Sequence, residues 1–480
     1  MELWKMYRNG EWVESLDKQT IQVLNPADLS MIASVPRGKS GDIDEAVMAA
    51  KTAFFSKEWK QFKPHERGYV LFELAQKIRE NKEELARLET LDVGKPLKQS
   101  LSDVDAAARY FEFYAGMADK IMGETIPIEN GILDYTVREP IGVTAHIVPW
   151  NYPIQISARS AAAAIAAGNA VVMKPAEDTP LTSLKLAEYF DRTNLPKGIF
   201  NVITGYGWEA GAALSSHPDI NHVTFTGSQQ TGRAVMEAAA KNIVPVTLEL
   251  GGKSPNLLFA DCELEEAVEW VVKSIIQNAG QTCSAGSRLL VEASIKDEVV
   301  AKIKERFEAL TIGPGIRDYD LGPIISQKQY ERIQSFIDLA EKEATIITGG
   351  KRISIEGNEN GCYMSPTLIE GVDPDSELAK EEIFGPVLTV FPFETEEEAV
   401  YLANNTPYGL VTGIWTMNSK KAHRVADQVQ SGQVFINNYG AAGGIQMPFG
   451  GYKRSGFGRE KGLEALKNYT QLKNVALKYY

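Results

Sequence analysis

The feature that most restricts the fold of this chain is a regular alternation of strand-like and helix-like runs between residues 141 and 250. Short apolar runs are followed by segments with apolar residues three and four positions apart, the pattern of successive β-α units. The expected strands are 141–149, 170–174, 200–204, 222–226 and 244–250, and the expected helices are 153–167, 182–192, 210–214 and 231–241. Because such units place their strands in parallel, this stretch predicts a doubly wound, nucleotide-binding domain.

The second half of the chain predicts another α/β series. Its expected strands are 256–259, 287–291, 345–348, 387–391, 412–416 and 433–437. Before the first series, residues 40–60 and 64–92 are predicted to be helices. Residues 121–140 form two extended runs around Asn130-Gly131, a pair that favours a hairpin turn. The hairpin and the weakly alternating tail (471–480) either serve subunit pairing or cover their own domain.

Length, charge and cysteine content restrict the class of protein. A chain of 480 residues suggests two or three domains. The net charge of −13 argues against a general affinity for nucleic acid or anionic membranes. Cys262, Cys283 and Cys362 form neither a disulfide framework nor a metal-ligand spacing, and we expect neither a signal segment nor a membrane span. We therefore expect a soluble, cytoplasmic protein without a metal site.

Cys283 is the candidate nucleophile. It lies in a segment of small residues, Asn278-Ala-Gly-Gln-Thr-Cys-Ser-Ala-Gly-Ser287, where a substrate could approach the sulfur closely. A helix or turn after it would present N–H groups that favour the thiolate. The alternative is a buried, inert cysteine, the usual state of a lone thiol. Cys262 and Cys362 lack such surroundings and are predicted to be structural.

Glu249 is the candidate base, because none of the five histidines lies in a segment that suggests catalysis. It stands at a predicted strand end, between Leu248 and Leu250 and just before two glycines. Desolvation there would raise its pKa towards neutrality, where a carboxylate can accept a proton from water or from a thiol. The alternative is an ordinary ion pair with Lys253.

Three turns follow predicted strands and carry polar residues. Asn151 could donate to a developing oxyanion or simply cap the next helix. The glycines of 225–232 would let N–H groups meet a pyrophosphate at a helix N-terminus, although the spacing is not the usual dinucleotide pattern. Lys174 and Glu177 could hold ribose hydroxyls, or form a solvated ion pair.

In this order, the segments closely resemble the aldehyde dehydrogenase superfamily over nearly the whole chain. The matching motifs are Pro149-Trp-Asn-Tyr-Pro153, Lys174-Pro-Ala-Glu177, Phe225-Thr-Gly-Ser228, Leu248-Glu-Leu-Gly-Gly-Lys-Ser-Pro255, Gly280-Gln-Thr-Cys283, Glu381-Glu-Ile-Phe-Gly-Pro386 and Pro448-Phe-Gly-Gly-Tyr-Lys-Arg-Ser-Gly456. The resemblance implies an α/β fold with a Rossmann-like cofactor-binding domain (1–120 and 141–250), an α/β catalytic domain (251–455) and a small β oligomerisation arm (121–140 and 460–480). It also implies a homodimer or homotetramer.

The resemblance implies roles for individual residues. Cys283 matches the family nucleophile, Glu249 the base that activates water, and Asn151 the side-chain donor of the oxyanion hole. The implied cofactor contacts are Ile147, Pro149, Trp150, Lys174, Glu177, Gly207, Gly211, Phe225, Gly227, Ser228, Gly232, Leu250, Glu382 and Phe384. The implied reaction oxidises an aldehyde to the carboxylic acid with NAD(P)⁺, through a hemithioacetal and a thioester on Cys283.

Two glutamates bear on the reaction type and the cofactor. Glu249 favours hydrolysis of the thioester, since branches that pass the acyl group to coenzyme A generally lack this residue; a CoA-acylating semialdehyde dehydrogenase is the alternative. Glu177 favours NAD, with NADP possible, because a carboxylate near the ribose 2′-OH repels a 2′-phosphate. Two alternatives involve no redox chemistry: a binding protein without activity, and a thiol hydrolase. The joint presence of Cys283, Glu249 and Asn151 argues against the binding protein.

Tyr152, Gln155 and Arg159 are the candidate substrate contacts. Helix spacing puts Asn151, Gln155 and Arg159 on one face. Arg159 followed by serine is similar to branches that act on aromatic aldehydes; it could bind an anionic oxygen or be tied to a local acid. The stretch 283–288 instead resembles betaine-aldehyde-type members, whose cationic substrate Arg159 would repel. An aromatic or another uncharged or anionic aldehyde is favoured over betaine-aldehyde-type or broad aliphatic specificity.

Overall fold

The computed structural model describes residues 3–440 and 443–480, and its first large sheet has eight strands. The order is β2 (Glu11–Val13), β1 (Met6–Arg8), β9 (Phe200–Val202), β8 (Ala170–Lys174), β7 (Val143–Ile147), β10 (His222–Thr226), β11 (Val246–Glu249) and β21 (Gly456–Phe457). The central strands β9 to β11 are parallel. Because β8 and β10 lie on opposite sides of β7, the strand order reverses there, and the carboxyl ends of strands at such a switch point are where ligands bind in sheets of this kind.

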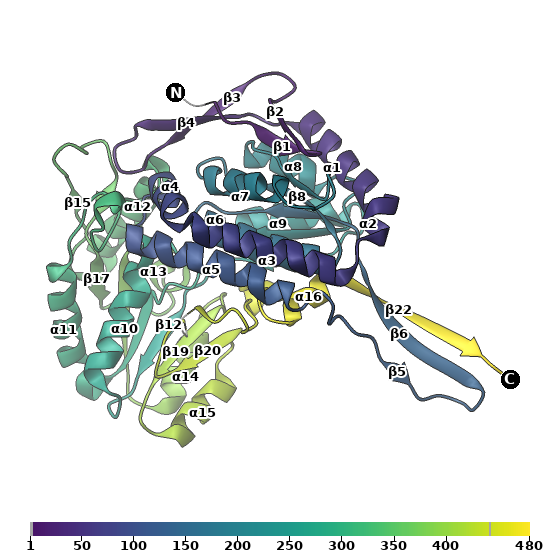
Figure 1. Cartoon of the computed structure of the whole chain (residues 1–480). Coiled ribbons are helices and arrows are strands. Elements are labelled where there is room, and N and C mark those ends of the chain that lie inside the picture. The colour runs from purple at the N-terminus through teal and green to yellow at the C-terminus, as the bar shows by residue number, and fades with distance from the viewer. Residues whose placement is uncertain (1–2, 441–442) are drawn as a thin grey trace.

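Helices of the first half pack on this sheet and on one another (Figure 1). They are α1 (Ser40–Phe55), α2 (Lys57–Gln61), α3 (Pro64–Glu80), α4 (Lys82–Val93), α5 (Leu97–Ala115), α6 (Pro153–Ala166), α7 (Leu181–Asp191), α8 (Ala212–Ser215) and α9 (Gln229–Ala240). The alanine-rich α6 is buried along nearly its whole length, since small side chains let it fit closely between the sheet and α5.

A second sheet of seven strands has its own hydrophobic core. The order is β14 (Thr345–Thr348), β17 (Thr367–Glu370), β18 (Val387–Phe393), β13 (Arg288–Glu292), β12 (Pro255–Leu258), β19 (Val411–Trp415) and β20 (Gln433–Ile436). All neighbours are parallel except β14 and β17. The helices of this half are α10 (Leu264–Ile276), α11 (Lys296–Ala309), α12 (Gln327–Glu343), α13 (Glu377–Lys380), α14 (Glu396–Asn404) and α15 (Ser419–Gln428).

A three-stranded sheet projects away from both units (Figure 1). It consists of β5 (Thr125–Ile126), β6 (Ile132–Pro140) and the C-terminal β22 (Thr470–Lys478), which pairs with β6 along nine residues. Residues 460–469, expected in this arm, are instead part of the first unit. Helix α16 (Glu464–Asn468) packs on α6, and Leu466 and Tyr469 lie in the first core.

The α/β expectation is confirmed, and most predicted elements lie within a few residues of those observed. The predicted helix 40–60 is interrupted at Ser56, whose side chain caps α2 by accepting from the Trp59 N–H. The predicted helix 64–92 is divided at Asn81. The hairpins β1–β2, β3 (Thr20–Leu24)–β4 (Met31–Pro36) and β15 (Arg352–Ile353)–β16 (Tyr363–Met364), and strand β17, were not predicted.

Candidate active site

The loop before Cys283 and the loop after β7 are bonded to each other. Asn151 Nδ2 donates to the Gln281 carbonyl at 2.9 Å, and Asn278 Nδ2 donates to the Asn151 carbonyl at 3.2 Å. The hydroxyls of Tyr152 and Thr282 lie 2.8 Å apart. These bonds hold Asn151, in the loop after β7, against the residues that precede the thiol. One N–H of its side-chain amide is bonded to the protein, and the other can donate to a ligand.

The thiol of Cys283 is half-buried and packs against an apolar cluster that includes Phe449 and Tyr439. Burial raises the pKa of Cys283 to about 12, opposed by the charge of Arg159 and reinforced by Glu249. A turn follows Cys283, in line with the helix or turn expected there, but desolvation is the largest effect on the pKa of the thiol and disfavours the thiolate. The thiol accordingly needs a base to react.

Glu249 ends β11 at the edge of the same site. It is 2% exposed, and neither carboxylate oxygen has a hydrogen-bond partner within the described residues. Burial, reinforced by Glu460, raises its pKa well above the ordinary range. The alternative of an ion pair with Lys253 is not observed, since the ammonium of Lys253 is itself without a partner there. A desolvated carboxylate of this kind binds protons readily, as a general base requires.

The backbone just before the thiol, and that of the loop at Phe384, is strained. Asn278, Ala279 and Gly280 have consecutive φ angles of 49°, 52° and 74°, and Phe384 has a φ of 61°. A side chain at position 280 would lie 2.1 Å from the Gly385 carbonyl, so the two loops touch at a glycine. Left-handed residues other than glycine cost roughly 1–3 kcal/mol each and occur preferentially at functional sites.

Glu382 lies beside the strand that carries Glu249. Its Oε1 accepts a hydrogen bond from the Gly252 N–H at 3.0 Å, and its carboxylate would overlap any side chain at position 251. Burial raises the pKa of Glu382 to about 7. The ring of Phe384 meets Trp150 edge to face, with 5.4 Å between ring centroids. The loop after α13 thus faces the loop after β7.

The predicted dinucleotide contacts gather at the carboxyl ends of the parallel strands. Lys174 Nζ pairs with Glu177 Oε2 at 3.0 Å, and small residues face this lysine at 207 and 211. Ser228 caps α9 by accepting from the Thr231 N–H. Two of the remaining predicted contacts, Pro149 and Gly227, are partly exposed loop residues. The others are buried: Ile147, Phe225, Gly232 and Leu250.

Three observations fit a dinucleotide at these residues. The N-terminus of α9 lies at the switch point of the sheet, where an anion is favoured. Gln229 Nε2, at that terminus, is buried and has no partner in the described part of the chain. Glycine at 207 and 211 keeps the surface beside Lys174 clear, where a Cβ would come within 4.0 and 3.7 Å of it.

The predicted substrate contacts are held by the protein. Arg159 is 5% exposed and forms an ion pair with Glu460, whose other oxygen accepts from Thr224. Although burial opposes it, Glu460 raises the pKa of Arg159. The interpretation of Arg159 as a substrate anchor is therefore not supported, and the alternative, an arginine tied to a local acid, is the one observed. Gln155 Nε2 donates to Asp103 at 3.1 Å.

Several residues near the site were not anticipated from the sequence. Glu460 and Lys461 stand in a run of alternating charge after Arg459, which reads as an exposed turn. Lys95 lies 4.0 Å from the centroid of the Tyr152 ring and 2.6 Å from Asp103. Its only sequence signal was a Gly-Lys-Pro turn after a helix. The contacts of Glu460 with Arg159 and of Lys95 with Tyr152 do not follow from spacing, because each joins distant parts of the chain.

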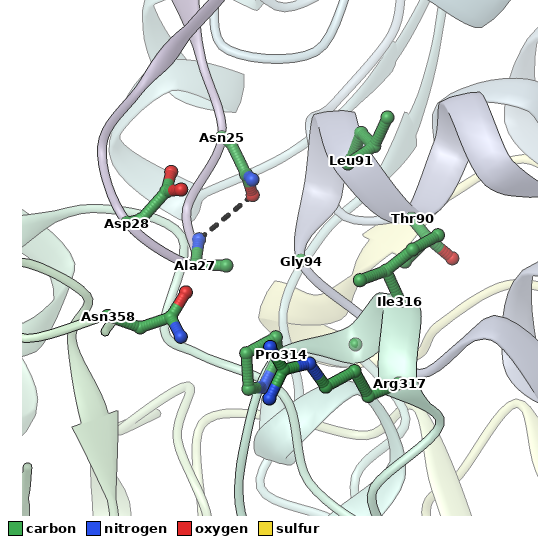
Figure 2. Close-up of a pocket in the computed structure, with 11 residues that line it drawn as sticks. Asn25, Ala27, Asp28, Thr90, Leu91, Gly94, Pro314, Ile316, Arg317 and Asn358 are labelled. Atoms are coloured by element: carbon green, nitrogen blue, oxygen red, sulfur yellow. Dashed lines mark hydrogen bonds between the residues drawn. The ribbon is translucent and has the colours of Figure 1, made fainter. Parts of the chain in front are cut away.

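The cavity in Figure 2 lies away from these residues. It is lined by the loop at Asn25 and Asp28, the end of α4, and the turn at Pro314–Arg317, and contains none of the predicted site residues.

None of the helices in the described part of the chain has the length and apolar character needed to cross a bilayer.

Comparisons with known proteins agree with this site. The model of the aldehyde dehydrogenase family matches residues 12–475. Hydroxyisobutyraldehyde dehydrogenase of Mycolicibacterium austroafricanum is 42% identical, covering 98% of this chain and 93% of its own. Betaine aldehyde dehydrogenase of Bacillus subtilis is 41% identical, covering 98% and 96%. The NAD⁺ complex of a Bacillus cereus aldehyde dehydrogenase superposes with a TM-score of 0.97, with 43% identity over 100% of this chain and 97% of that one.

The chain belongs to the aldehyde dehydrogenase family. The resemblance read from the motifs is thereby confirmed, and the reaction is oxidation of an aldehyde with NAD(P)⁺. The comparisons do not fix the aldehyde, since relatives of nearly equal identity are named for different ones.

Proposed function

We propose that this enzyme oxidises its aldehyde through a covalent intermediate on Cys283, with Glu249 as base and Asn151 in the oxyanion hole. The observation that carries the proposal is a buried carboxylate without a partner at a site shared with a thiol and a fixed amide. Lys174, Glu177, Glu382, the glycine turns and the start of α9 bind the dinucleotide, which when bound accepts the hydride.

The chain's own residues supply positioning and proton transfer. Glu249 takes the thiol proton, and the sulfur of Cys283 forms a bond to the aldehyde carbon. The free N–H of Asn151 and the backbone N–H of Cys283 stabilise the negative oxygen. After oxidation the carbon is bound to sulfur as a thioester. Glu249 passes the thiol proton to solvent, which restores its carboxylate, and then takes a proton from water. The water oxygen bonds to the thioester carbon and displaces the sulfur as thiolate, which releases the acid.

We expect NADH to form from NAD⁺ and an aldehyde without added coenzyme A, and the acid to appear in equal amount. Glu249 supports this hydrolytic route. Glu177, held at Lys174, supports faster initial rates with NAD⁺ than with NADP⁺. The assay records NADH absorbance and titrates the acid. A strict dependence on coenzyme A would instead assign an acylating enzyme, and activity without any dinucleotide would assign a thiol hydrolase.

The arm supports a further part of the proposal, assembly with a second copy of the chain. Its sheet exposes Leu133, Leu472 and Leu477 at 41%, 58% and 55%, and its strands have no core of their own. Three strands that expose apolar groups on both faces are stabilised when another surface covers them. We therefore propose a homodimer or homotetramer in which the arm contacts a neighbouring subunit.

Charging both faces of the arm is expected to dissociate the assembly. Leu472 and Leu477 stand on opposite faces of β22, so the pair Leu472→Asp and Leu477→Asp places a carboxylate on each. Sedimentation velocity should show an oligomer for the wild type and a monomer for the variant. Lys473→Asp, on an already polar position, is the control. A monomeric wild type would refute this part of the proposal and leave the reaction untouched.

The compartment also belongs to the proposal. All three cysteines are free, and the thiol of Cys283 must stay reduced to react. A reducing compartment such as the cytoplasm meets that need.

A further inference from the structure

Lys461 projects onto the aromatic wall beside the proposed nucleophile. The backbones of Phe449 and Glu460 exchange hydrogen bonds of 2.6 and 2.7 Å, which aligns Lys461 with the segment that passes Glu249. A side chain at Gly450 would lie 2.9 Å from Glu249 Oε1. The ammonium of Lys461 lies 5.1 Å from the centroid of the Phe449 ring, in the cluster against which Cys283 packs.

The ammonium of Lys461 has no ion-pair partner in the part of the chain that the structure describes. Its sequence neighbour Glu460 is occupied by Arg159 and Thr224. Lys461 forms no ion pair among residues 3–440 and 443–480, and its ammonium donates one hydrogen bond, to the Gly443 carbonyl at 3.5 Å. Burial and the neighbouring charge of Arg159 lower its pKa to about 8. A partly desolvated cation without a counter-ion gains most from an anion brought by a ligand.

The backbone at this lysine is also held in an unfavourable conformation. Its φ of 62° places a residue with a Cβ in the left-handed region. The next residue, Gly462, has a φ of 57° and meets no such penalty. Strain of this kind persists where the surrounding structure enforces it. Here the strained backbone directs the Lys461 side chain towards Phe449, in the cluster against which Cys283 packs.

We propose that Lys461 selects the charge of the substrate by pairing with an anionic group on the aldehyde. The preferred substrates are then aldehydes that also carry a carboxylate, and cationic aldehydes are repelled. Arg159 does not take this role, because Glu460 neutralises it. The inference rests on the proposed function of Cys283, since it places the aldehyde carbon at that sulfur and the anion at Lys461.

The test compares each acid with its neutral amide in the variant Lys461→Met, which keeps the stem on Phe449 and removes the charge. The probes are 4-carboxybenzaldehyde with 4-formylbenzamide, and 4-oxobutanoate with 4-oxobutanamide. The variant should lose about tenfold or more in kcat/KM for at least one acid and less than about threefold for its amide. Lys461→Arg should retain the preference. Lys467→Met, at an exposed position of α16 where the lysine pairs with Glu464, is the matched control.

Several outcomes separate this inference from the proposed function. Equal losses on acid and amide, or a wild type that prefers both amides, would overturn the role of Lys461 alone. No NADH from any probe, nor from propanal or benzaldehyde, counts against the proposed function. Should Lys461→Met fail to fold, the wild-type enzyme tests the inference by its ratio of kcat/KM for acid over amide. High salt should lower this ratio, because it screens the attraction between Lys461 and a carboxylate and does not affect a neutral amide. A ratio that does not change with salt would overturn the role of Lys461.

Discussion

Replacing Cys283 by alanine should lower aldehyde-dependent NADH formation by at least about 10⁴-fold while NAD⁺ still binds. No other thiol can substitute, because Cys362 is buried and bonded to Gln327, and Cys262 follows β12 outside the site. Steady-state rates measure the loss, and titration of NAD⁺ against intrinsic fluorescence shows whether the dinucleotide site survives.

The matched control is Cys262→Ser, which changes a half-buried thiol that no proposed step uses. It should retain wild-type rates. Rapid turnover of Cys283→Ala would remove the proposed nucleophile, whereas loss of NAD⁺ binding along with activity would indicate damage to the fold.

The thiol should also show its burial in solution. Since the pKa of Cys283 is raised to about 12, its alkylation by iodoacetamide without NAD⁺ should be slow at neutral pH and accelerate as pH rises. The acceleration follows the thiolate fraction, which grows until the pH reaches that pKa. Mass spectrometry of the labelled peptide records the rate at this residue.

Replacing Glu249 by glutamine should separate the two halves of the reaction. The thioester still forms, but water is no longer activated, so that one NADH appears per site and later turnover falls by roughly 10²–10⁴-fold. Because Glu249 also receives the thiol proton in the proposal, the first turnover should slow as well. Rapid-quench measurement of NADH, together with intact mass of the acylated enzyme, resolves both phases.

The pH dependence of hydrolysis gives an independent readout of this carboxyl group. Its pKa in the folded enzyme is raised, so the ionised base is populated only at higher pH than for an ordinary glutamate. The wild-type rate of thioester hydrolysis should therefore increase as pH rises through that pKa, and the increase should vanish in Glu249→Gln. Glu266→Gln, on the exposed first turn of α10, is the control. Unchanged turnover and an unchanged pH profile would exclude Glu249 as base.

The sequence by itself determined the order of elements and the main chemical candidates. Hydrophobic periodicity is local, so the strands at 170–174 and 345–348 could be placed at their observed bounds. The small residues around Cys283 and the apolar flanks of Glu249 are likewise local, and together with the ordered motifs they predicted the family.

Only the tertiary structure decided which charges meet. Helical spacing placed Arg159 on the face of Asn151, but could not reveal that Glu460 would take its charge. Residues 460–469 were expected in the arm, yet α16 belongs to the first core because Leu466 and Tyr469 are buried there. The thiol was expected to be activated, and burial raises its pKa instead. Desolvation and ion pairing depend on groups that folding brings together from distant parts of the chain, and a local pattern contains no record of them.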